Sequence, residues 1–397
     1  MRHFSFLSET ERGAIFAVPP AEISRADPRE RLALALGATL YMPGTRATLA
    51  ADAHRAGHVG AASVVWCLED AIPHDAVALG EQTVAAGLRA IAADPEPRSL
   101  PLVFVRVRSP EQLTRLVRLA GPGVAGLSGF VLPKCDAGLA AAYLTAIEAA
   151  AAATGTRLFA MPVLETPQLA WRETRATALT DLRAVVDAHA DTVLAIRLGA
   201  TDLCGLFGLR RDPDTTIWDV AVVREVLADA VNVFARRGEH VVTGPVWEHV
   251  DGERLFRPQL RASPFEAALG GGRLRAAMLR EDVDGLIREV VLDGANGLTG
   301  KTVIHPSHVA VVNALHTVTR EEHDDALTVV AGARAGGVAR STGGATMLEF
   351  GPHELWARRT CARAEVFGVL RTPAALVELL AAGRAAAAAA YPARAFV

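Results

Sequence analysis

The chain has 397 residues, 51% of them hydrophobic and 21% charged, which supplies a large core and excludes a disordered chain. Its net charge is −3, from 41 basic and 44 acidic residues that are interspersed along the sequence. That balance excludes a protein that recruits nucleic acid through a basic surface.

The first 36 residues precede the first predicted strand. Residues 1–16 contain no apolar signal segment, and the apolar runs of the chain are shorter than the ~20 residues that a membrane helix needs. We therefore expect a cytoplasmic protein with no membrane partner. The pair Pro19 and Pro20 predicts that residues 1–36 form an N-terminal extension across the outside of the main domain.

Short apolar runs follow in chain order, each with a loop and an alanine- and leucine-rich helical stretch behind it. The predicted strands cover residues 39–43, 63–69, 102–107, 129–134, 158–165, 193–199, 241–247 and 301–305. Continuous apolar runs are typical of parallel strands that are buried on both faces. No GxGxxG loop follows an early strand, so these eight βα units predict an α/β protein, with a closed (β/α)8 TIM barrel over residues 37–317.

Some segments depart from this rhythm after the seventh strand. Residues 251–295 predict a long insertion between the seventh and eighth strands, broken at Gly270 to Gly272. Residues 331–345 are rich in glycine and predict a flexible linker. The helical pattern and the alanine tract beyond it predict that residues 318–397 form a C-terminal helical lid or an oligomerisation arm.

Polar residues close most of the predicted strands, and the carboxyl ends of the strands carry the active site in TIM barrels. They are Glu69, Asp70, Arg106, Arg108, Lys134, Glu165, Asp202, Glu248, Lys301 and His305. Taken singly, such an acid is often a helix cap, and a base can pair with a neighbouring carboxylate. Their coincidence at seven strands favours a shared site, because charges gathered at a buried rim must be paired or bind a charged ligand.

Glu165 and Asp202 close consecutive predicted strands, the fifth and the sixth. Carboxylates on adjacent strands suit a hard divalent cation whose remaining positions are filled by water and substrate oxygens. The sequence has no HxH, HExxH or cysteine cluster of the kind that holds zinc. It therefore predicts Mg²⁺, or Mn²⁺ in its place, on these carboxylates.

A set of short motifs occurs in a fixed order between residues 37 and 317. They are LYMPG (40–44), CLEDAI (67–72), VRVRS (105–109), GFVLPK (129–134), PVLET (162–166), LGATDL (198–203) and TGKTVIHPSH (299–308). The ordered set resembles the citrate lyase beta-subunit-like branch of the HpcH/HpaI aldolase family, which includes malyl-CoA and citramalyl-CoA lyases. The resemblance implies a TIM barrel that acts on carbon–carbon bonds.

The resemblance also implies roles for individual residues. Glu165 and Asp202 would bind magnesium, and Arg106 would contact the carboxylate or the developing enolate oxygen of the substrate. Glu69 and Asp70 would support Arg106. The remaining matches place Lys134 among the catalytic residues and Pro43, Gly44 and His305 among the substrate-binding residues.

Through the C-terminal segment, the resemblance also implies a general base and an oligomeric state. Some relatives contribute a catalytic acid from this segment across a subunit interface, and GGATMLEF (343–350) places Glu349 at the corresponding position. We therefore expect a homotrimer or a homohexamer. A metal-bound water is the alternative base.

Three departures from the family pattern argue against recognition of coenzyme A. Gly37 stands where relatives have arginine, His308 stands where they have glutamine, and residues 251–295 enlarge a connection that is short in relatives. Two substrate classes therefore stay open. The protein is expected to act on a 2-oxo or hydroxy acid as its acyl-CoA thioester, or on a free acid as a class II pyruvate aldolase does.

The resemblance narrows further at the N-terminus. MRHFSFL (1–7) and ALGATLYMPG (35–44) are similar to a bacterial subgroup associated with tellurium-resistance gene clusters. The expected function is a magnesium-dependent carbon–carbon lyase or aldolase. The alternative is a non-catalytic barrel subunit of a biosynthetic or stress-resistance complex, and the joint presence of Glu165, Asp202 and Arg106 argues against it.

Overall fold

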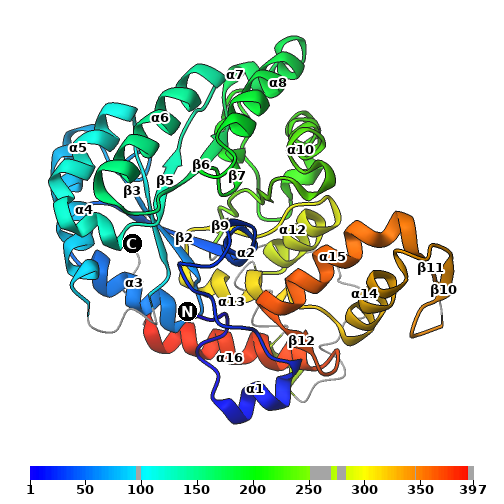
Figure 1. Ribbon diagram of the computed structural model, residues 1–397. Coiled ribbons are helices and arrows are strands. Elements are labelled where there is room, and N and C mark those ends of the chain that lie inside the picture. Colours follow the sequence, from blue (N-terminus) through cyan, green and yellow to red (C-terminus); the bar gives the residue numbers. More distant parts are fainter. Residues whose placement is uncertain (95–99, 251–269, 275–282, 345, 392–397) are drawn as a thin grey trace.

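Eight parallel strands form a closed barrel in the computed structural model, which describes residues 1–94, 100–250, 270–274, 283–344 and 346–391 (Figure 1). The strands are β2 (Ala38–Pro43), β3 (Ser63–Cys67), β4 (Leu102–Arg106), β5 (Gly129–Leu132), β6 (Phe159–Leu164), β7 (Ile196–Leu198), β8 (Val242–Thr243) and β9 (Lys301–Val303). Their order is β8-β7-β6-β5-β4-β3-β2-β9. A parallel bridge between Gly244 and Lys301 joins the two outermost strands, which confirms the predicted (β/α)8 barrel.

Helices follow the strands around the outside of the barrel. They are α3 (Leu49–His58), α4 (Val77–Ala92), α5 (Pro110–Ala120), α6 (Ala137–Thr154), α7 (Pro167–Ala170), α8 (Arg172–Ala188), α9 (Ala200–Gly205), α10 (Ala221–Phe234), α12 (Val283–Ala295) and α13 (Pro306–Ala314). Short 3-10 turns lie between them: η1 (His74–Ala76), η3 (Gly121–Gly126), η4 (Ile217–Asp219) and η5 (Arg236–Gly238).

Local sequence signals set several of these helix ends. The Asp136 side chain accepts a hydrogen bond from Leu139 N and so caps the start of α6. Gly155, in the left-handed region at φ 66°, ends the same helix. Helix α6 is long and apolar enough to cross a membrane by length and composition alone, and here it packs against α5 and α8 of the barrel.

The N-terminal ends of the strands are closed by α2 (Arg29–Ala35). Leu32 and Leu36 belong to one buried cluster with inward-facing strand residues such as Phe104 and Val131. Residues 29–36 are therefore the floor of the barrel. Their predicted place across the outside of the domain was wrong for this part, because apolar side chains in this segment find the open end of the barrel and bury themselves there.

The two ends of the described chain meet beside the barrel. Helix α1 (Glu9–Ile15) leads into β1 (Phe16–Val18), which pairs antiparallel with β12 (Val369–Leu370). Helix α16 (Ala375–Ala390) then packs along α13 and touches α1 and α3. The N-terminal extension and the C-terminal segment thus form one continuous layer on the outside of the barrel, against α13 and α3.

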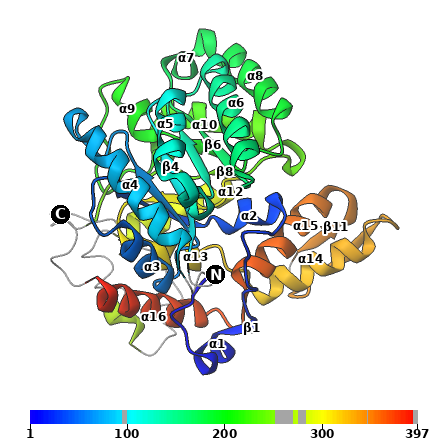
Figure 2. The same ribbon diagram turned by 60° about the vertical axis from the view of Figure 1, so that its left-hand side comes forward.

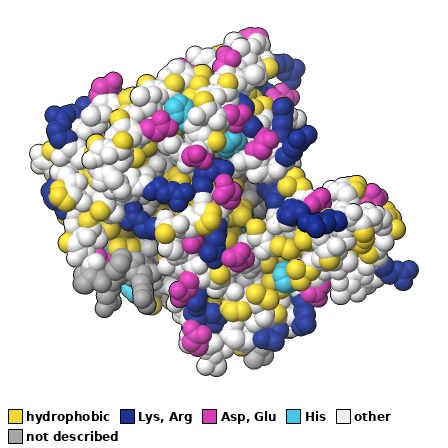
Figure 3. Space-filling model, in the orientation of Figure 1, with side chains coloured by type: hydrophobic (Ala, Val, Ile, Leu, Met, Phe, Trp, Pro, Cys, Tyr) yellow, Lys and Arg dark blue, Asp and Glu magenta, His cyan; other side chains and the backbone are white. Residues whose placement is uncertain are grey.

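An arm projects from the barrel, and in the sequence it lies between α13 and β12 (Figures 1 and 2). It consists of α14 (Arg320–Gly332), β10 (Val338–Arg340), β11 (Met347–Glu349) and α15 (Phe350–Phe367). Strands β10 and β11 pair antiparallel, so the predicted flexible linker over residues 331–345 was wrong. Leu348 of β11 is buried with Ala326 and Val329 of α14, so the hairpin packs against this helix. In the view of Figure 3, basic and acidic side chains are interspersed over barrel and arm.

The base of the arm lies at the floor of the barrel. Phe367 and Val366 of α15 join the buried cluster of α2, and Glu365 pairs with Arg31 at 3.1 Å. The carboxyl ends of the strands are at the opposite end of the barrel. Residues 320–367 therefore project as an arm and do not cover the mouth of their own barrel (Figure 1).

The connection between β8 and β9 contains the barrel's own helix, α12. Lys301 of β9 is fully buried and pairs with Glu289 at 2.8 Å and Asp293 at 2.7 Å, both on this helix. The predicted insertion over 251–295 was therefore too long at its C-terminal end. Residues 251–269 and 275–282 lie outside the described residues.

Candidate active site at the carboxyl ends of the strands

Six of the predicted site residues meet in one cluster at the mouth of the barrel: Glu69, Asp70, Arg106, Lys134, Glu165 and Asp202. Arg106 Nη2 lies 2.8 Å from Glu69 Oε2, and 3.0 Å from Glu165 Oε1. Lys134 Nζ lies 2.5 Å from Glu69 Oε1 and 3.8 Å from Asp202 Oδ1. These residues follow or end five consecutive strands, β3 to β7, as the sequence predicted.

Arg108 fixes the loop that carries Glu69 and Asp70. Its guanidinium donates hydrogen bonds to the carbonyl oxygens of Leu68 at 2.6 Å, Glu69 at 2.7 Å and Ile72 at 3.0 Å. Backbone carbonyls that a neighbouring strand holds in this way cannot drift, so the two acids keep their positions beside Arg106. Asp70 in turn lies 3.3 Å from Arg106 and 3.5 Å from Lys134.

Lys134 contributes its backbone as well as its charge. It adopts a left-handed conformation with φ 51°, which is uncommon for a residue with a side chain. In this conformation its N–H donates a hydrogen bond of 2.9 Å to Glu165 Oε1. Burial lowers the pKa of the Lys134 ammonium, but its hydrogen bond to Glu69 and the charges of Asp70 and Asp202 raise it above its ordinary value, so Lys134 is a cation at neutral pH.

Glu165 is the most enclosed acid of the cluster, with 2% of its side chain exposed. Burial raises the pKa of its carboxyl to about 7, against the opposing pull of Arg106 and with a further upward push from Asp202. The carboxylate lies directly over Gly199, where a Cβ atom would come within 2.0 Å of Glu165 Oε2. The sequence needs glycine here so that β7 can pass beneath the carboxylate.

The donor set suits magnesium. Glu165 Oε1 is taken by Arg106 and by the Lys134 N–H, whereas Oε2 accepts no hydrogen bond from the described residues. Asp202 stands in the first turn of α9 with 31% of its side chain exposed. Among the described residues no three His, Cys, Asp or Glu side chains gather into a metal site. Two carboxylates with water and substrate oxygens are a usual set for Mg²⁺ and too few for a structural metal.

A cavity of about 280 Å³ opens over this cluster. Its lining includes Asp70, Arg106, Glu165, Asp202, Tyr41, Arg197 and Thr302. This volume is just below the ~300 Å³ at which ordinary small-molecule pockets begin, so it suits a small acid.

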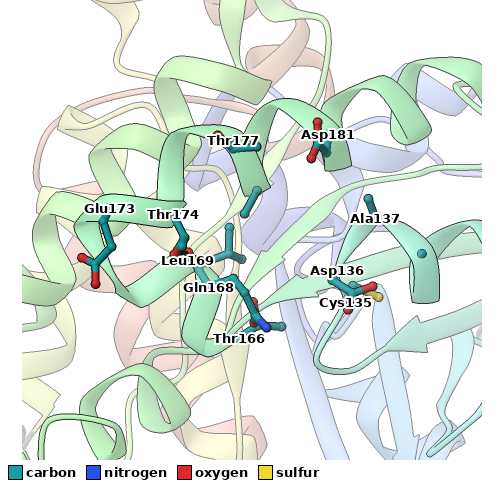
Figure 4. A pocket seen from close by; sticks show the side chains of 12 residues that line it. Cys135, Asp136, Ala137, Thr166, Gln168, Leu169, Glu173, Thr174, Thr177 and Asp181 are labelled. Carbon is teal, nitrogen blue, oxygen red and sulfur yellow. Dashed lines mark hydrogen bonds between the residues drawn. The ribbon is translucent and has the colours of Figure 1, made fainter.

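A second, larger cavity of about 610 Å³ lies beside the mouth, between the start of α6 and the helices α7 and α8 (Figure 4). It is lined by Asp136, Thr166, Gln168, Glu173 and Asp181, among others. Neither Arg106 nor Glu165 nor Asp202 lines it. The candidate reaction site is therefore the smaller cavity, in which the charged residues converge.

Comparison with known proteins agrees with this geometry. The family model described as "C-C_Bond_Lyase of the TIM-Barrel fold" matches residues 30–369 of the chain. The chain belongs to this family. A search of the curated proteins found no match.

Solved structures of carbon–carbon lyases share the fold of this family member. One is CitE from Mycobacterium tuberculosis in complex with magnesium, acetoacetate and coenzyme A, with 21% identity, a TM-score of 0.51 and coverage of 86% of this chain and 99% of that one. Another is a citrate lyase from Burkholderia xenovorans LB400, with 16% identity, a TM-score of 0.59 and coverage of 86% and 96%. At these identities the similarity shows the fold alone.

Four other predicted residues of this carbon–carbon lyase family member are not among the residues that line the cavity. Pro43 ends β2, and Gly44 packs under the β3 backbone, where a Cβ atom would come within 2.9 Å of the Cys67 carbonyl oxygen. His305 accepts a hydrogen bond from Ser307 N and caps α13. Glu349 lies on β11 in the arm. Within one chain the structure does not bring these four residues to the cluster.

The sequence prediction missed Arg197, Tyr41 and Thr302. All three lie inside predicted strands and face the barrel interior instead of closing a strand. A search restricted to strand ends could not find them. The available signal was the charge of Arg197 in the middle of the apolar run 193–199, because a cation there must point into the interior or into the helix layer.

Proposed function

We propose that this protein is a magnesium-dependent lyase or aldolase that breaks or forms a carbon–carbon bond of a 2-oxo or hydroxy acid. The observation that carries the proposal is the pairing of Glu165 and Asp202 at one cavity with Arg106 beside them. Family membership supports the reaction class. The Mg²⁺ complex of the Mycobacterium tuberculosis relative supports the metal.

The residues of the cavity divide the chemistry between them. A divalent cation at Glu165 and Asp202 supplies Lewis-acid polarisation of the substrate oxygens. Arg106 faces the same cavity and stabilises negative charge on a substrate oxygen as the carbon–carbon bond changes. Glu69 holds Arg106 and Lys134 in place through one carboxylate, so both cations keep their orientation before substrate arrives.

Removal of either metal-binding carboxylate tests the proposal. Glu165→Gln and Asp202→Asn each lower the affinity for Mg²⁺ by about tenfold or more, because each removes one of only two anionic ligands. Isothermal titration calorimetry measures this change. Asp181→Asn is the matched control, because Asp181 lines the neighbouring cavity and keeps the wild-type affinity. Unchanged Mg²⁺ affinity in both site variants contradicts the assignment.

The structure removes two arguments against coenzyme A. Gly37 has φ 51°, and a Cβ atom there would come within 2.5 Å of Asn313 Oδ1, so this position has no room for the family's arginine. It precedes β2 at the floor of the barrel. His308 is buried within α13 and does not line the cavity. Both departures are packing differences away from the mouth.

A thioester substrate therefore fits the proposal as well as a free acid. Coenzyme A in the complex of the Mycobacterium tuberculosis relative supports the thioester. Acetyl-CoA binding that depends on Mg²⁺, measured by calorimetry, selects this class. Its absence, together with exchange of the pyruvate methyl protons for deuterium followed by NMR, selects the pyruvate aldolase.

The general base is proposed to come from a neighbouring copy of the chain. Glu349 is far along the arm of its own chain, and an arm that projects from one barrel can reach the mouth of another. The functional unit is then a homotrimer or homohexamer. Glu349→Gln lowers turnover and leaves Mg²⁺ affinity unchanged, and light scattering gives the mass of an oligomer. A fully active monomer contradicts this assignment.

The narrower lineage and the location stay predictions. Membership of the subgroup near tellurium-resistance genes rests on the N-terminal residues 1–7 and on the junction at 35–44. Deletion of the gene in its host, with growth scored on tellurite, tests the link. Fractionation of the same cells tests the cytoplasmic location.

A further inference from the structure

Arg197 is a buried cation that lines the bottom of the candidate reaction cavity. Its residue is 1% exposed. Nη1 lies 3.3 Å from Thr39 Oγ1, Nη2 lies 2.5 Å from Thr302 Oγ1, and the guanidinium carbon lies 5.6 Å from the centre of the Tyr41 ring. Its buried Nε has no hydrogen-bond partner. No carboxylate in the described part of the chain pairs with it.

This lack of a counter-charge sets Arg197 apart from the other buried cations. Transferring the charged side chain of an arginine from water to the protein interior costs on the order of several kcal/mol. Proteins normally offset that cost with a neighbouring carboxylate. The other buried Arg and Lys residues among the described ones follow the rule: Arg12 pairs with Glu9, Arg175 with Asp229, Arg211 with Glu289, and Lys301 with Glu289 and Asp293.

The position of Arg197 explains what could complete it. Arg197 and Val163 are register partners on β7 and β6, and Glu165 follows Val163 by two residues on the same face of β6. Two residues along a strand are about 6.6 Å, so the Cα atom of Arg197 lies one layer of inward-facing residues below that of Glu165. Tyr41 and Thr302, which surround it, line the cavity as well.

We propose that Arg197 binds a second carboxylate of the substrate. The acid would place the carboxylate next to its oxo or hydroxyl group at Glu165, Asp202 and Arg106, and would direct the other one down to Arg197. This inference rests on the proposed function and narrows its substrate class to 2-oxo or 2-hydroxy acids that carry a further free carboxylate.

The charges of the cavity favour this class over a simple monocarboxylate. Arg106 and Lys134 are already matched by Glu69, Asp70 and Glu165, so they offer no uncompensated charge for a second anion. A monocarboxylic acid such as pyruvate would leave the guanidinium of Arg197 buried and unpaired. The Thr302 hydroxyl beside it lines the cavity, and Nε of Arg197 has no hydrogen-bond partner, so a carboxylate can add hydrogen bonds at this end of the cavity.

Two stable 2-hydroxy acids that differ only in the second carboxylate test the inference. Malate and lactate are titrated into the full-length protein with saturating Mg²⁺ and followed by calorimetry. Wild type binds malate about tenfold or more tightly than lactate, because a hydrogen-bonded charge pair is worth about that factor. Arg197→Met abolishes this preference and leaves lactate binding unchanged. Arg197→Lys, which keeps the charge, retains part of the preference.

Controls separate binding from folding. Arg175→Met removes a buried arginine of α8 that lies outside the cavity, and it keeps the wild-type ratio of malate to lactate affinity. Thermal unfolding of each variant reports its fold, and Arg197→Met removes an unpaired charge, which is often neutral for stability. If Arg197→Met does not fold, Arg197→Lys decides the question through its malate preference.

The outcomes distinguish this inference from the proposed function. Equal affinity for malate and lactate in wild type overturns the inference alone, and so does an equal loss of both in Arg197→Met. Tighter binding of 3-phosphoglycerate than of malate, with the same loss in the variant, overturns the choice of a carboxylate as the second anion. If neither acid binds in the presence of Mg²⁺, the proposed function fails and the inference fails with it.

Discussion

Glu165 has to satisfy two opposing requirements. The barrel buries it, which favours the neutral acid, and its proposed role needs the carboxylate. Arg106 and the N–H of Lys134 occupy one of its oxygens, so only the other is left for a cation. A single side chain thus joins the electrostatics of the interior to metal binding.

Metal binding is expected to depend on pH through this residue. The pKa of Glu165 in the metal-free protein is about 7, and a proton and Mg²⁺ compete for the same carboxylate. The affinity for Mg²⁺ therefore falls about tenfold when the pH is lowered from 8 to 6. Calorimetry at the two pH values measures the change. An affinity that is the same at pH 6 and pH 8 contradicts the raised pKa.

The same group affects the stability of the metal-free protein in the opposite direction. Its pKa rises on folding from 4.5 to about 7, so between these values the folded state binds the proton more tightly than the unfolded state. The contribution of Glu165 to the free energy of unfolding is fully present below pH 4.5 and is lost as the pH rises through 7. Subtracting the pH profile of Glu165→Gln from that of wild type in urea unfolding isolates it.

At the scale of elements, the turn from β7 into α9 sets the position of both proposed metal ligands. Gly199 lets the carboxylate of Glu165 lie against the backbone, and Asp202 follows within the first turn of α9. The short strand and the short helix together keep the two acids at the same cavity.

Gly199→Ala is expected to disrupt this turn. The added methyl group would lie 2.0 Å from Glu165 Oε2, so the carboxylate must move. We expect Mg²⁺ affinity to fall by about tenfold or more, because ligands held within roughly 0.5 Å of their geometry are displaced. Calorimetry measures the affinity, and circular dichroism confirms that the barrel is intact.

Gly205→Ala is the matched control, at the other end of the same helix. Nothing lies within 4 Å of a Cβ atom there, and alanine favours a helix over glycine. This variant keeps the wild-type affinity for Mg²⁺. A similar loss in both variants would show that α9 responds to any added methyl group, and the specific contact with Glu165 would be excluded.

The elements show how far the sequence could predict the structure. The strands and the acids at their ends follow from short apolar runs and the geometry of parallel barrels, and the structure confirms them. Lys301 was misplaced, because it begins β9 and pairs outward with α12. Hairpin β10–β11 was missed, because a few residues between glycines have no strand period and their contacts, through Leu348 and Ala339, are with a cluster on α14.

Arg197 shows the limit at the residue level. Sequence periodicity predicts which strand it belongs to, but its neighbours Thr39 and Thr302 come from β2 and β9, which do not pair with β7. Contacts across a closed barrel depend on the register of all its strands, which no local pattern contains. The same reason hides Tyr41 from a search of strand ends.

For the whole molecule, closure of the barrel depends on a buried ion cluster. Lys301, on the last strand, is fully buried between Glu289 and Asp293 of α12. Arg211 adds a further contact with Glu289 at 2.6 Å. Burial also raises the pKa of Asp293 to about 6, and the charge of Lys301 opposes this rise. The carboxylate of Asp293 therefore stays ionised only while Lys301 lies beside it.

Lys301→Met is expected to destabilise the protein by about 3–5 kcal/mol, because it leaves the buried carboxylate of Asp293 without its cation. Urea unfolding measures the free energy. Arg288→Met is the comparison, since Arg288 pairs with Asp219 at the surface and its loss costs under about 1 kcal/mol. Equal effects of the two substitutions would mean that the buried cluster contributes no more than an exposed pair.

The pairing of β1 with β12 links residues near the two ends of the chain, Phe16 and Leu370. A ribosome adds about 5–20 residues per second, so Phe16 waits on the order of 20–70 s for its partner. Throughout that time the floor lacks Phe367 as well. The barrel can therefore reach its final form only after Leu370 has been synthesised, and a nascent polypeptide stalled before this point leaves apolar surface for a chaperone to cover.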